Sequence, residues 1–193
     1  MKVVAFNGSP RPDGNTAALI QAVFGALGQE GIQTEMVQVG GKRVRGCTAC
    51  FQCFTQRNRK CAIQDDALNE WMAKMEEADG IILASPTYFA DVTSEIKALI
   101  DRAGMTSRAN EDLFRRKVGA AVVAVRRAGA LHAFDTLNHF FLIGQMIIPG
   151  SCYWNIGVGR EKGAVKKDEE GLLTMQTLGK NMAWLLKRLA RNI

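Results

Sequence analysis

The sequence lacks any apolar run approaching the ~18 residues that would suggest a membrane-spanning helix, so we expect no membrane association. It also lacks a recognisable signal peptide, because the apolar stretch after Lys2 ends at Phe6 and turn-forming residues follow. We therefore expect a cytoplasmic protein whose thiols are normally reduced. No internal repeat, low-complexity tract or linker divides the 193 residues, and this length favours a single domain, residues 1–193.

Several motifs are absent as well. No G-x-x-x-x-G-K-[ST] occurs, which excludes a Walker-type NTP site, and no G-x-G-x-x-G follows a predicted strand. The two histidines, His132 and His139, lie on one expected helix without an H-E-x-x-H motif, so we expect a surface or core role for them. The hydrophobic fraction of 47% and charged fraction of 23% are typical of a globular protein and argue against disorder, collagen or a coiled coil.

The net charge of +6 originates in one segment of the chain. Between Gly40 and Gln64 there are six basic residues and no acidic one, while the other 19 Lys and Arg balance the 19 Asp and Glu. A general nucleic-acid-binding protein would carry a basic face over more of the chain, so we expect no nucleic-acid partner. Because the same segment holds four of the five cysteines, the charge suggests thiolates, a cluster or an anionic cofactor. The six basic residues are Lys42, Arg43, Arg45, Arg57, Arg59 and Lys60.

Short apolar runs alternate with helical patterns along the chain. The runs predict strands at residues 3–6, 34–39, 80–85 and 118–125 and a fifth strand beginning at 146–148. The helical patterns follow Thr16, follow the N-cap candidates Asp65 and Asp66, begin near 91–94, and cover 131–143 and about 172–189. This alternation predicts an α/β fold with a doubly wound parallel sheet and helices on both faces. Ligands in such sheets bind at the carboxyl ends of the strands, here the loops after residues 6, 85 and 125.

The loop after the first predicted strand has the composition of a phosphate site. It runs from Asn7 to Thr16 and opens a helix, whose N-terminus offers unpaired N–H groups and about half a positive charge. Ser9, Asn15 and Thr16 add short hydrogen-bonding groups, and Arg11 adds a planar cation. This composition indicates a site for a phosphate monoester that is held without a metal. A plain polar turn with a helix cap would have the same composition and is the alternative.

The same loop carries a specific resemblance. Gly8-Ser9-Pro10-Arg11 with Gly14-Asn15-Thr16 resembles the phosphate loop of the NADPH-dependent FMN reductase and iron–sulfur flavoprotein families. The stretch Ser85-Pro86-Thr87-Tyr88-Phe89 resembles their second flavin loop, and Lys97 with Asp101-Arg102 resembles the residues that follow it. The resemblance extends over essentially the whole chain. It implies a flavodoxin-like fold, with a five-stranded parallel sheet of strand order 2-1-3-4-5.

The resemblance implies FMN as the cofactor, with the chemistry carried by the flavin and no catalytic side chain. It implies that the phosphate is held by Ser9, Arg11, Asn15 and Thr16, and that the isoalloxazine is lined by Pro86, Thr87, Tyr88 and Phe89. The loop that begins with Arg126 and Arg127 departs from the family pattern by having more arginine and less glycine. These arginines could face the phosphates of a nicotinamide cofactor.

Four cysteines lie in a segment at about 42–64 that we interpret as an insertion loop. Cys47, Cys50 and Cys53 form C-x2-C-x2-C, and Cys61 follows after seven more residues. Three close thiols and a more distant fourth can hold a [4Fe–4S] cluster, whereas structural zinc usually takes two separated pairs. The pattern resembles the compact cysteine motif of the iron–sulfur flavoproteins. Zinc, free or regulatory thiols and disulfides remain alternatives, and Cys152, in an apolar context, is expected to be buried.

These observations support three hypotheses. The first is an FMN-dependent oxidoreductase that passes electrons between NAD(P)H, or a small electron-carrier protein, and an acceptor through FMN and a [4Fe–4S] cluster. The resemblance implies a homodimer or homotetramer, with electron transfer across a subunit interface and the apolar seam of the last helix as a possible contact. The second is a simple NAD(P)H-dependent FMN or quinone reductase without a cluster. The third is a zinc- or thiol-containing binding module.

Overall fold

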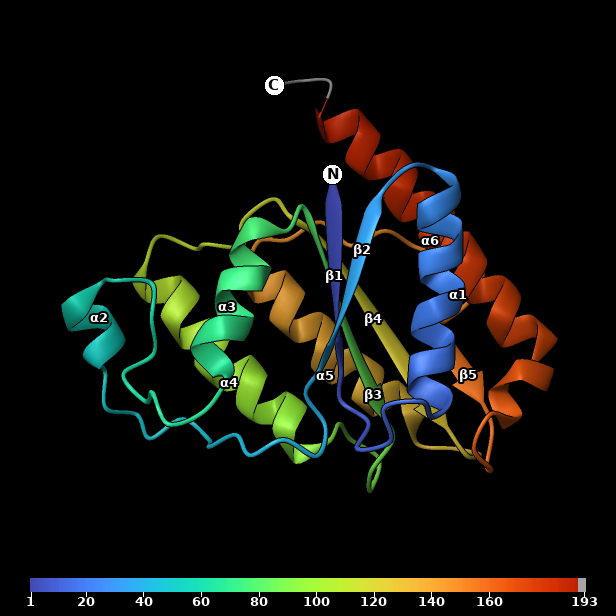
Figure 1. Cartoon of the computed structure of the whole chain (residues 1–193), viewed down its shortest axis with the longest axis horizontal. Coiled ribbons are helices and arrows are strands. Elements are labelled where there is room, and N and C mark those ends of the chain that lie inside the picture. The colour runs from blue at the N-terminus through green and yellow to red at the C-terminus, as the bar shows by residue number, and fades with distance from the viewer. Residues whose placement is uncertain (191–193) are drawn as a thin grey trace.

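A five-stranded parallel sheet forms the centre of the computed structural model, which describes residues 1–190 (Figure 1). The strand order is β2-β1-β3-β4-β5, as predicted, and all four strand pairs are parallel. The predicted single domain extends to residue 193, so its last three residues lie outside the described part. The strands are β1 (Lys2–Asn7), β2 (Gln33–Gln38), β3 (Gly80–Pro86), β4 (Val118–Val125) and β5 (Ile156–Val158).

Helices cover both faces of the sheet and enclose two separate apolar cores. One core lies between the sheet and α3, α4 and α5, and the other between the sheet and α1 and α6 (Figure 1). No helix within residues 1–190 is both long and apolar enough to cross a lipid bilayer. The helices are α1 (Asn15–Gln29), α2 (Gln52–Gln56), α3 (Leu68–Glu77), α4 (Ser94–Ala109), α5 (Ala130–Ile143), the 3₁₀ helix η1 (Ala164–Lys167) and α6 (Glu169–Ala190).

The central strands β3 and β4 are buried on both sides, which explains their uninterrupted apolar sequences. Every residue of β4 is buried, and its bounds match the predicted strand at 118–125. Since all strands run in the same direction, the loops after β1, β3 and β4 meet at one edge of the sheet, at the bottom of Figure 1. This edge is where the fold can bind a ligand.

The fifth strand lies further along the chain than predicted. Residues 146–148 do not form a strand, because Ile147 makes only an isolated bridge to Val118, and Pro149 follows without an N–H to extend it. The chain instead crosses the sheet end and pairs Ile156–Val158 with the last three residues of β4. The loop that follows the fifth strand at this edge of the sheet therefore begins after Val158.

Three further expectations need correction. The N-cap position of α3 is Ala67 rather than Asp65 or Asp66. The Asp66 carboxylate nevertheless accepts a hydrogen bond of 3.2 Å from the Leu68 N–H at the start of the helix, and it also pairs with Arg102 of α4. Cys152 is exposed rather than buried. The apolar seam of α6 is not free for a partner subunit, because it packs in the core against α1 and the sheet; its buried residues include Met175, Leu178 and Met182.

Candidate functional site

The loop between β1 and α1 is fixed to its neighbours by hydrogen bonds and by close packing. The Gly8 N–H donates to the Ala84 carbonyl at 2.8 Å, and the Thr93 hydroxyl donates to the Gly8 carbonyl at 3.0 Å. A Cβ atom on Gly8 would lie 2.2 Å from a side-chain carbon of Ile96 and 2.9 Å from the Ala84 oxygen. Only glycine therefore allows β1, β3 and the start of α4 to approach this closely.

The N-terminus of α1 opens at the edge of this loop. Its N-cap is Gly14, and within the described chain no side chain caps the first turn. The first N–H groups of the helix consequently point out without intrahelical partners, as an anion site requires. Ser9 is buried beside them, while Arg11 is exposed. The Asn15 side chain lines the same space, but its amide donates to the Gly159 carbonyl at 2.9 Å and thereby fastens the loop after β5.

The loop after β3 forms the opposite wall. The Thr87 N–H donates to the Ala124 carbonyl at 2.8 Å, which holds the loop against β4. Tyr88 and Asp91 exchange two backbone hydrogen bonds of 2.8 and 2.9 Å, so the two residues between them form a tight turn in the left-handed region. Tyr88 is half exposed, and the Phe89 side chain on the turn is fully exposed.

These loops enclose a polar pocket of about 190 Å³ at the carboxyl ends of β1, β3 and β4. Seven of the eight predicted flavin-site residues line it, and Phe89 does not. The Thr87 Oγ1 atom is buried and has no hydrogen-bond partner within the described structure. The residues that line the pocket include three arginines and no acidic residue, so the pocket is positively charged. The lining residues are Ser9, Arg11, Asn15, Thr16, Pro86, Thr87, Tyr88, Ala124, Val125, Arg126, Gly159 and Arg160.

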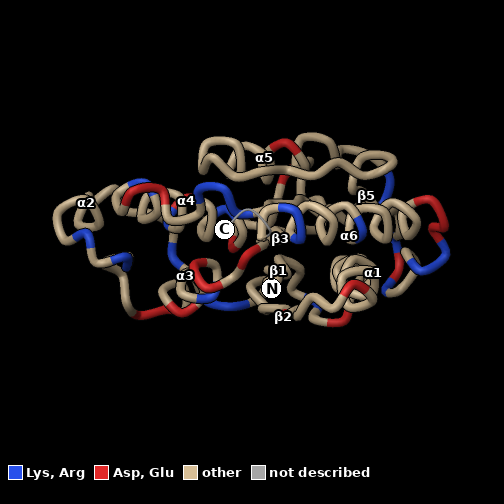
Figure 2. The backbone as a smooth tube through the Cα atoms, turned by 90° about the horizontal axis from the view of Figure 1, so that it is seen from above, with Lys and Arg blue, Asp and Glu red and all other residues tan. Residues whose placement is uncertain are grey.

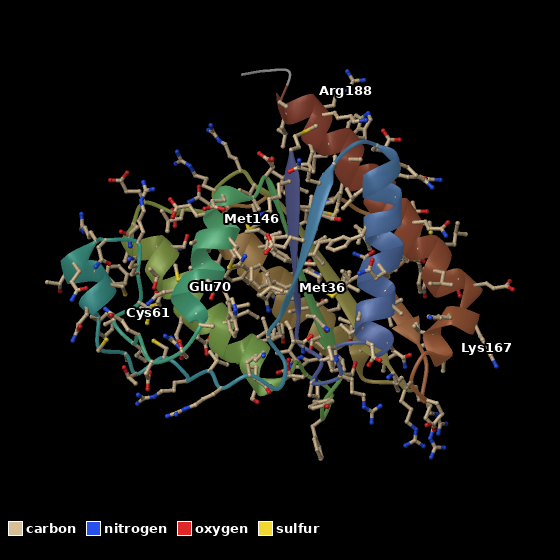
Figure 3. The ribbon with its side chains drawn as sticks, viewed as in Figure 1. Met36, Cys61, Glu70, Met146, Lys167 and Arg188 are labelled. Atoms are coloured by element: carbon tan, nitrogen blue, oxygen red, sulfur yellow. The ribbon has the colours of Figure 1, made fainter. Side chains whose placement is uncertain are left out.

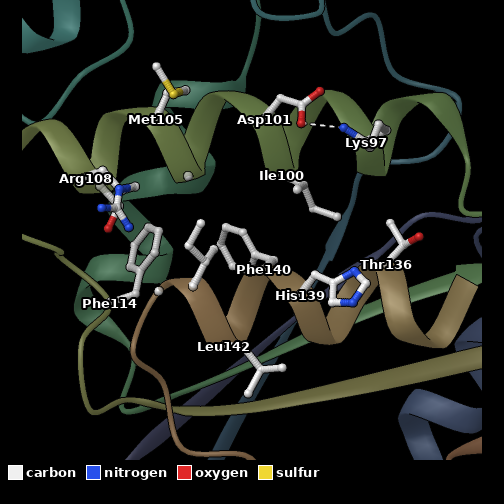
Figure 4. A pocket seen from close by; sticks show the side chains of 14 residues that line it. Lys97, Ile100, Asp101, Met105, Arg108, Phe114, Thr136, His139, Phe140 and Leu142 are labelled. Carbon is white, nitrogen blue, oxygen red and sulfur yellow. Dashed lines mark hydrogen bonds and ion pairs between the residues drawn. The ribbon is translucent and has the colours of Figure 1, made fainter.

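A larger and mainly apolar cavity of about 680 Å³ lies elsewhere, between α4 and α5 (Figure 4). Phe114 and Phe140 line its apolar wall, and an ion pair of 2.5 Å between Lys97 and Asp101 lies along α4. This cavity is lined by α4, α5 and Phe114 and by none of the loops after β1, β3 and β4. We therefore place the candidate reaction site in the smaller, polar pocket.

The cysteine segment connects β2 to α3 and has little regular structure (Figure 1). Its one helix, α2, has five residues and is flanked by Phe51 and Arg57, both in the left-handed conformation. Figure 2 shows Lys and Arg on the stretches of chain that lead to and from α2. Figure 3 shows Cys61 on the side of the molecule away from α1.

All four predicted ligand cysteines, Cys47, Cys50, Cys53 and Cys61, line one small cavity of about 20 Å³. Within residues 1–190, no three side chains of Cys, His, Asp or Glu are already close enough to hold a metal ion. Sequence spacing therefore brings the thiols to a common space, but in the structure they are not drawn together around one point.

The surroundings of the thiols differ. Hydrogen bonds from the Gln52 N–H and the Thr48 side chain lower the pKa of the exposed Cys50 thiol. Burial raises the pKa of Cys53. The Cys61 sulfur accepts a hydrogen bond of 3.3 Å from the Arg102 side chain, which α4 projects into the segment.

Comparison with known proteins assigns the chain to a family. The family model described as NADPH-dependent FMN reductase matches residues 1–161. The chain belongs to this family. It is a flavin-dependent oxidoreductase, and the family supports FMN as its cofactor and a nicotinamide cofactor as its partner.

Curated relatives of this FMN reductase family member include iron–sulfur flavoproteins. One from Methanocaldococcus jannaschii is 41% identical over 97% of this chain and 98% of its own length. Another, from Methanosarcina thermophila, is 30% identical over 100% of this chain and 98% of its own length. In both cases the similarity spans nearly the whole length of this chain and of the relative.

Solved structures support the fold. RosB has a TM-score of 0.76 at 18% identity, with 99% of this chain and 81% of RosB covered. A flavone reductase has a TM-score of 0.74 at 15% identity, with 98% of this chain and 64% of that chain covered. At such identities the likeness establishes the flavodoxin-like architecture.

The part of the polar pocket that sequence reasoning missed comes from the loop after β5. Gly159 and Arg160 line the pocket because they follow the end of β5, where ligand-binding loops occur. Because the sequence predicts that the fifth strand begins at residues 146–148, Gly159 and Arg160 are not expected to follow a strand end. The available signal was the short run Ile156–Val158 directly before a glycine and an arginine.

Proposed function

We propose that the polar pocket binds FMN with its phosphate at the N-terminus of α1 and its isoalloxazine against the loop after β3. The pocket itself carries this proposal: it combines free helix N–H groups, Arg11 and no acidic lining residue, as a dianionic phosphate requires. The buried Thr87 Oγ1 without a partner adds a hydrogen-bonding group for the flavin or its ribityl chain.

Each proposed binding residue has a task that its position allows. The hydroxyls of Ser9 and Thr16 and the Arg11 guanidinium donate to the phosphate, while Asn15 fixes the loop after β5. Pro86, Thr87 and Tyr88 provide a wall for the isoalloxazine ring. We propose that Phe89, the next residue of the same loop, also contacts the ring. FMN, when bound, supplies the ability to accept a hydride and to release electrons singly.

The nicotinamide cofactor has a basic approach to this pocket. Arg126 and Arg160 line it, and Arg127 is the exposed neighbour of Arg126. A phosphate dianion needs only part of this charge, so the remaining arginines can attract the phosphates of NAD(P)H. A small electron-carrier protein is the other donor we consider. RosB, a structural neighbour, was solved with a bound riboflavin-5'-phosphate derivative, which supports a flavin phosphate as the ligand of this architecture.

We further propose that Cys47, Cys50, Cys53 and Cys61 hold a [4Fe–4S] cluster. Their side chains line one cavity, and four cysteine thiolates are the donor set that a [4Fe–4S] cluster requires. The cavity of about 20 Å³ has room for only about one water molecule, so the Cys47–Cys53 loop must move outward to admit the cluster. The cluster, when bound, supplies one-electron transfer, and the iron–sulfur flavoprotein names of the relatives support its presence.

We propose a cytoplasmic homodimer or homotetramer. The outer part of α5 presents exposed Leu131, Leu142 and Ile143, and the cavity between α4 and α5 lies beside it (Figure 4). A second copy of the chain that covers this surface would bury apolar area now exposed to water.

Flavin and metal analysis of anaerobically purified protein tests the function. We expect a brown protein with one FMN and four irons per chain. Cys53→Ala should lose the iron and its brown absorbance but remain yellow, whereas the matched control Cys152→Ala, at an exposed cysteine outside the segment, should keep both.

Other compositions would contradict parts of the proposal. Yellow protein without iron would favour the simple FMN or quinone reductase. Colourless protein containing zinc would favour a binding module. Absence of flavin even after incubation with excess FMN would refute the redox assignment of the pocket.

A further inference from the structure

A buried arginine lies at the centre of the cysteine segment but belongs to a different element. Arg102 is on the third turn of α4, its side chain is fully buried, and it is among the largest side chains so enclosed. Transfer of a guanidinium from water into the protein interior is costly unless charged and polar partners surround it. The identity of those partners therefore indicates what Arg102 is for.

All the partners of the Arg102 side chain lie in residues 45–66. Its Nη1 donates to the Asp66 carboxylate at 2.5 Å and to the Arg45 carbonyl at 3.1 Å. Its Nη2 donates to the Ile63 carbonyl at 3.0 Å, and its Nε donates to the Cys61 sulfur at 3.3 Å. One partner precedes the three clustered cysteines, and the others are Cys61 itself and two residues that follow it, so one planar group holds both ends of the segment together.

The charge of Arg102 acts differently from that of the basic residues within the segment. Arg43, Arg45 and Arg59 have side chains that are 82, 52 and 64% exposed, so water and salt screen them. Arg102 is shielded from solvent, cannot lose its proton, and points one N–H directly at a predicted ligand sulfur. Hydrogen bonds to the sulfurs and nearby charge are among the factors that set the reduction potential of an iron–sulfur cluster.

We propose that Arg102 is a positioning residue of the cluster site, which fixes Cys61 toward the other three cysteines and raises the reduction potential of the cluster. This inference rests on the proposed [4Fe–4S] function. The hydrogen bond from Nε to the Cys61 sulfur stabilises the form of the cluster that carries one more electron, whereas the positive charge of Arg102 is balanced by the buried Asp66 carboxylate. Asp66 and the two carbonyls keep the guanidinium in the plane that this contact needs.

The test is the midpoint potential of the cluster, measured by anaerobic titration followed by electron paramagnetic resonance. The double variant Arg102→Gln/Asp66→Asn removes both buried charges together and avoids leaving Asp66 unpaired. We expect its cluster to be at least tenfold harder to reduce, a shift of about 59 mV to more negative potential. Arg43→Gln, an exposed arginine of the same segment, is the matched control and should leave the potential nearly unchanged.

A second variant covers the case in which the double variant does not fold. Arg102→Lys keeps the charge but loses the fork that reaches Asp66, Cys61 and the carbonyls at once. We expect fewer clusters per chain and a more negative potential, with FMN content at the wild-type level as evidence of an intact fold. An unchanged potential and iron content in the variants that bind FMN would overturn the role of Arg102, whereas wild-type protein without iron would overturn the cluster itself.

Discussion

Arg11 and Arg102 both lie beside a proposed cofactor, but in opposite surroundings. Arg102 is enclosed and has four partners, so its position is fixed before any cofactor is present. Arg11 is exposed at the mouth of the pocket, and its hydrogen bonds within the described structure are made by its backbone. Its contribution to FMN binding must therefore come from direct contact with the phosphate.

We predict that Arg11→Ala weakens FMN binding by about 1.5–3 kcal/mol, the range for a hydrogen bond to a charged group. Fluorescence titration of apoprotein with FMN measures the effect. Arg188→Ala, an exposed arginine near the far end of α6, is the control and should bind FMN like the wild type. An equal affinity of Arg11→Ala and wild type would contradict the placement of the phosphate.

Glu35 provides a pH-dependent contribution to stability. Hydrogen bonds from Lys2 and Lys74, each at 2.6 Å, lower its pKa and connect β1, β2 and α3. Because the folded-state pKa is depressed, the contribution is present above the unfolded value of about 4.3 and is lost as pH falls through the folded value.

We predict that Glu35→Gln lowers the free energy of unfolding by about 1 kcal/mol or less at pH 7, as expected for a partly exposed ion pair. The difference in stability between the variant and the wild type should shrink as the pH falls from 7 to 3. Urea unfolding at the two pH values measures both differences. A deficit of the variant that persists unchanged at pH 3 would show that the ion pairs are not its cause.

At the scale of elements, α1 and α6 are packed without room for another atom between them. A Cβ on Gly179 of α6 would lie 2.6 Å from the Val23 carbonyl oxygen and 2.7 Å from the Ala26 side chain. By contrast, a Cβ on Gly25 of α1 would meet nothing within 4 Å. The two helical glycines thus differ in what a methyl group would meet.

We predict opposite effects of the same substitution at these positions. Gly179→Ala should destabilise the fold by about 1–3 kcal/mol because α6 must move away from α1. Gly25→Ala should stabilise it by about 0.5–1 kcal/mol because alanine has the higher helix propensity. Thermal unfolding of the two variants against wild type gives the comparison, and stabilisation by Gly179→Ala would contradict the close packing of the helices.

The elements that the sequence predicts well are those with a strong apolar period. The buried strand at 118–125 and the helix at Ala130–Ile143 needed no knowledge of tertiary contacts. The missed elements depend on such contacts: α2 has five residues between left-handed ends, and β5 has three residues selected by pairing with β4. For the same reason the pocket residues after β1 and β3 could be predicted, whereas Gly159 and Arg160 could not.

At the scale of the whole molecule, α4 connects the two proposed cofactor sites. Thr93 at its N-cap donates to the Gly8 carbonyl in the phosphate loop, and Arg102 further along binds the cysteine segment. The eight residue-to-residue steps from Ser94 to Arg102 extend for ~12 Å along a helix axis. One rigid element therefore sets the separation of the sites within a chain.

We predict that Leu142→Glu produces a monomer, because a charge would replace a 62% exposed leucine on the surface that we propose a second copy covers. Light scattering coupled to size exclusion measures the mass. Leu173→Glu, at a 57% exposed leucine on α6, is the control and should keep the wild-type mass. A wild-type mass for Leu142→Glu would move the interface to another surface.

The placement of the cysteines has a consequence for how the protein is made. Three of the four proposed ligand cysteines lie outside both apolar cores, and Cys61 packs only at the edge of one. The sheet and its helices can therefore fold before iron and sulfide are delivered, and Arg102 holds the ends of the cysteine segment together in the meantime. Iron starvation should then leave a folded yellow protein awaiting maturation rather than a substrate for proteolysis.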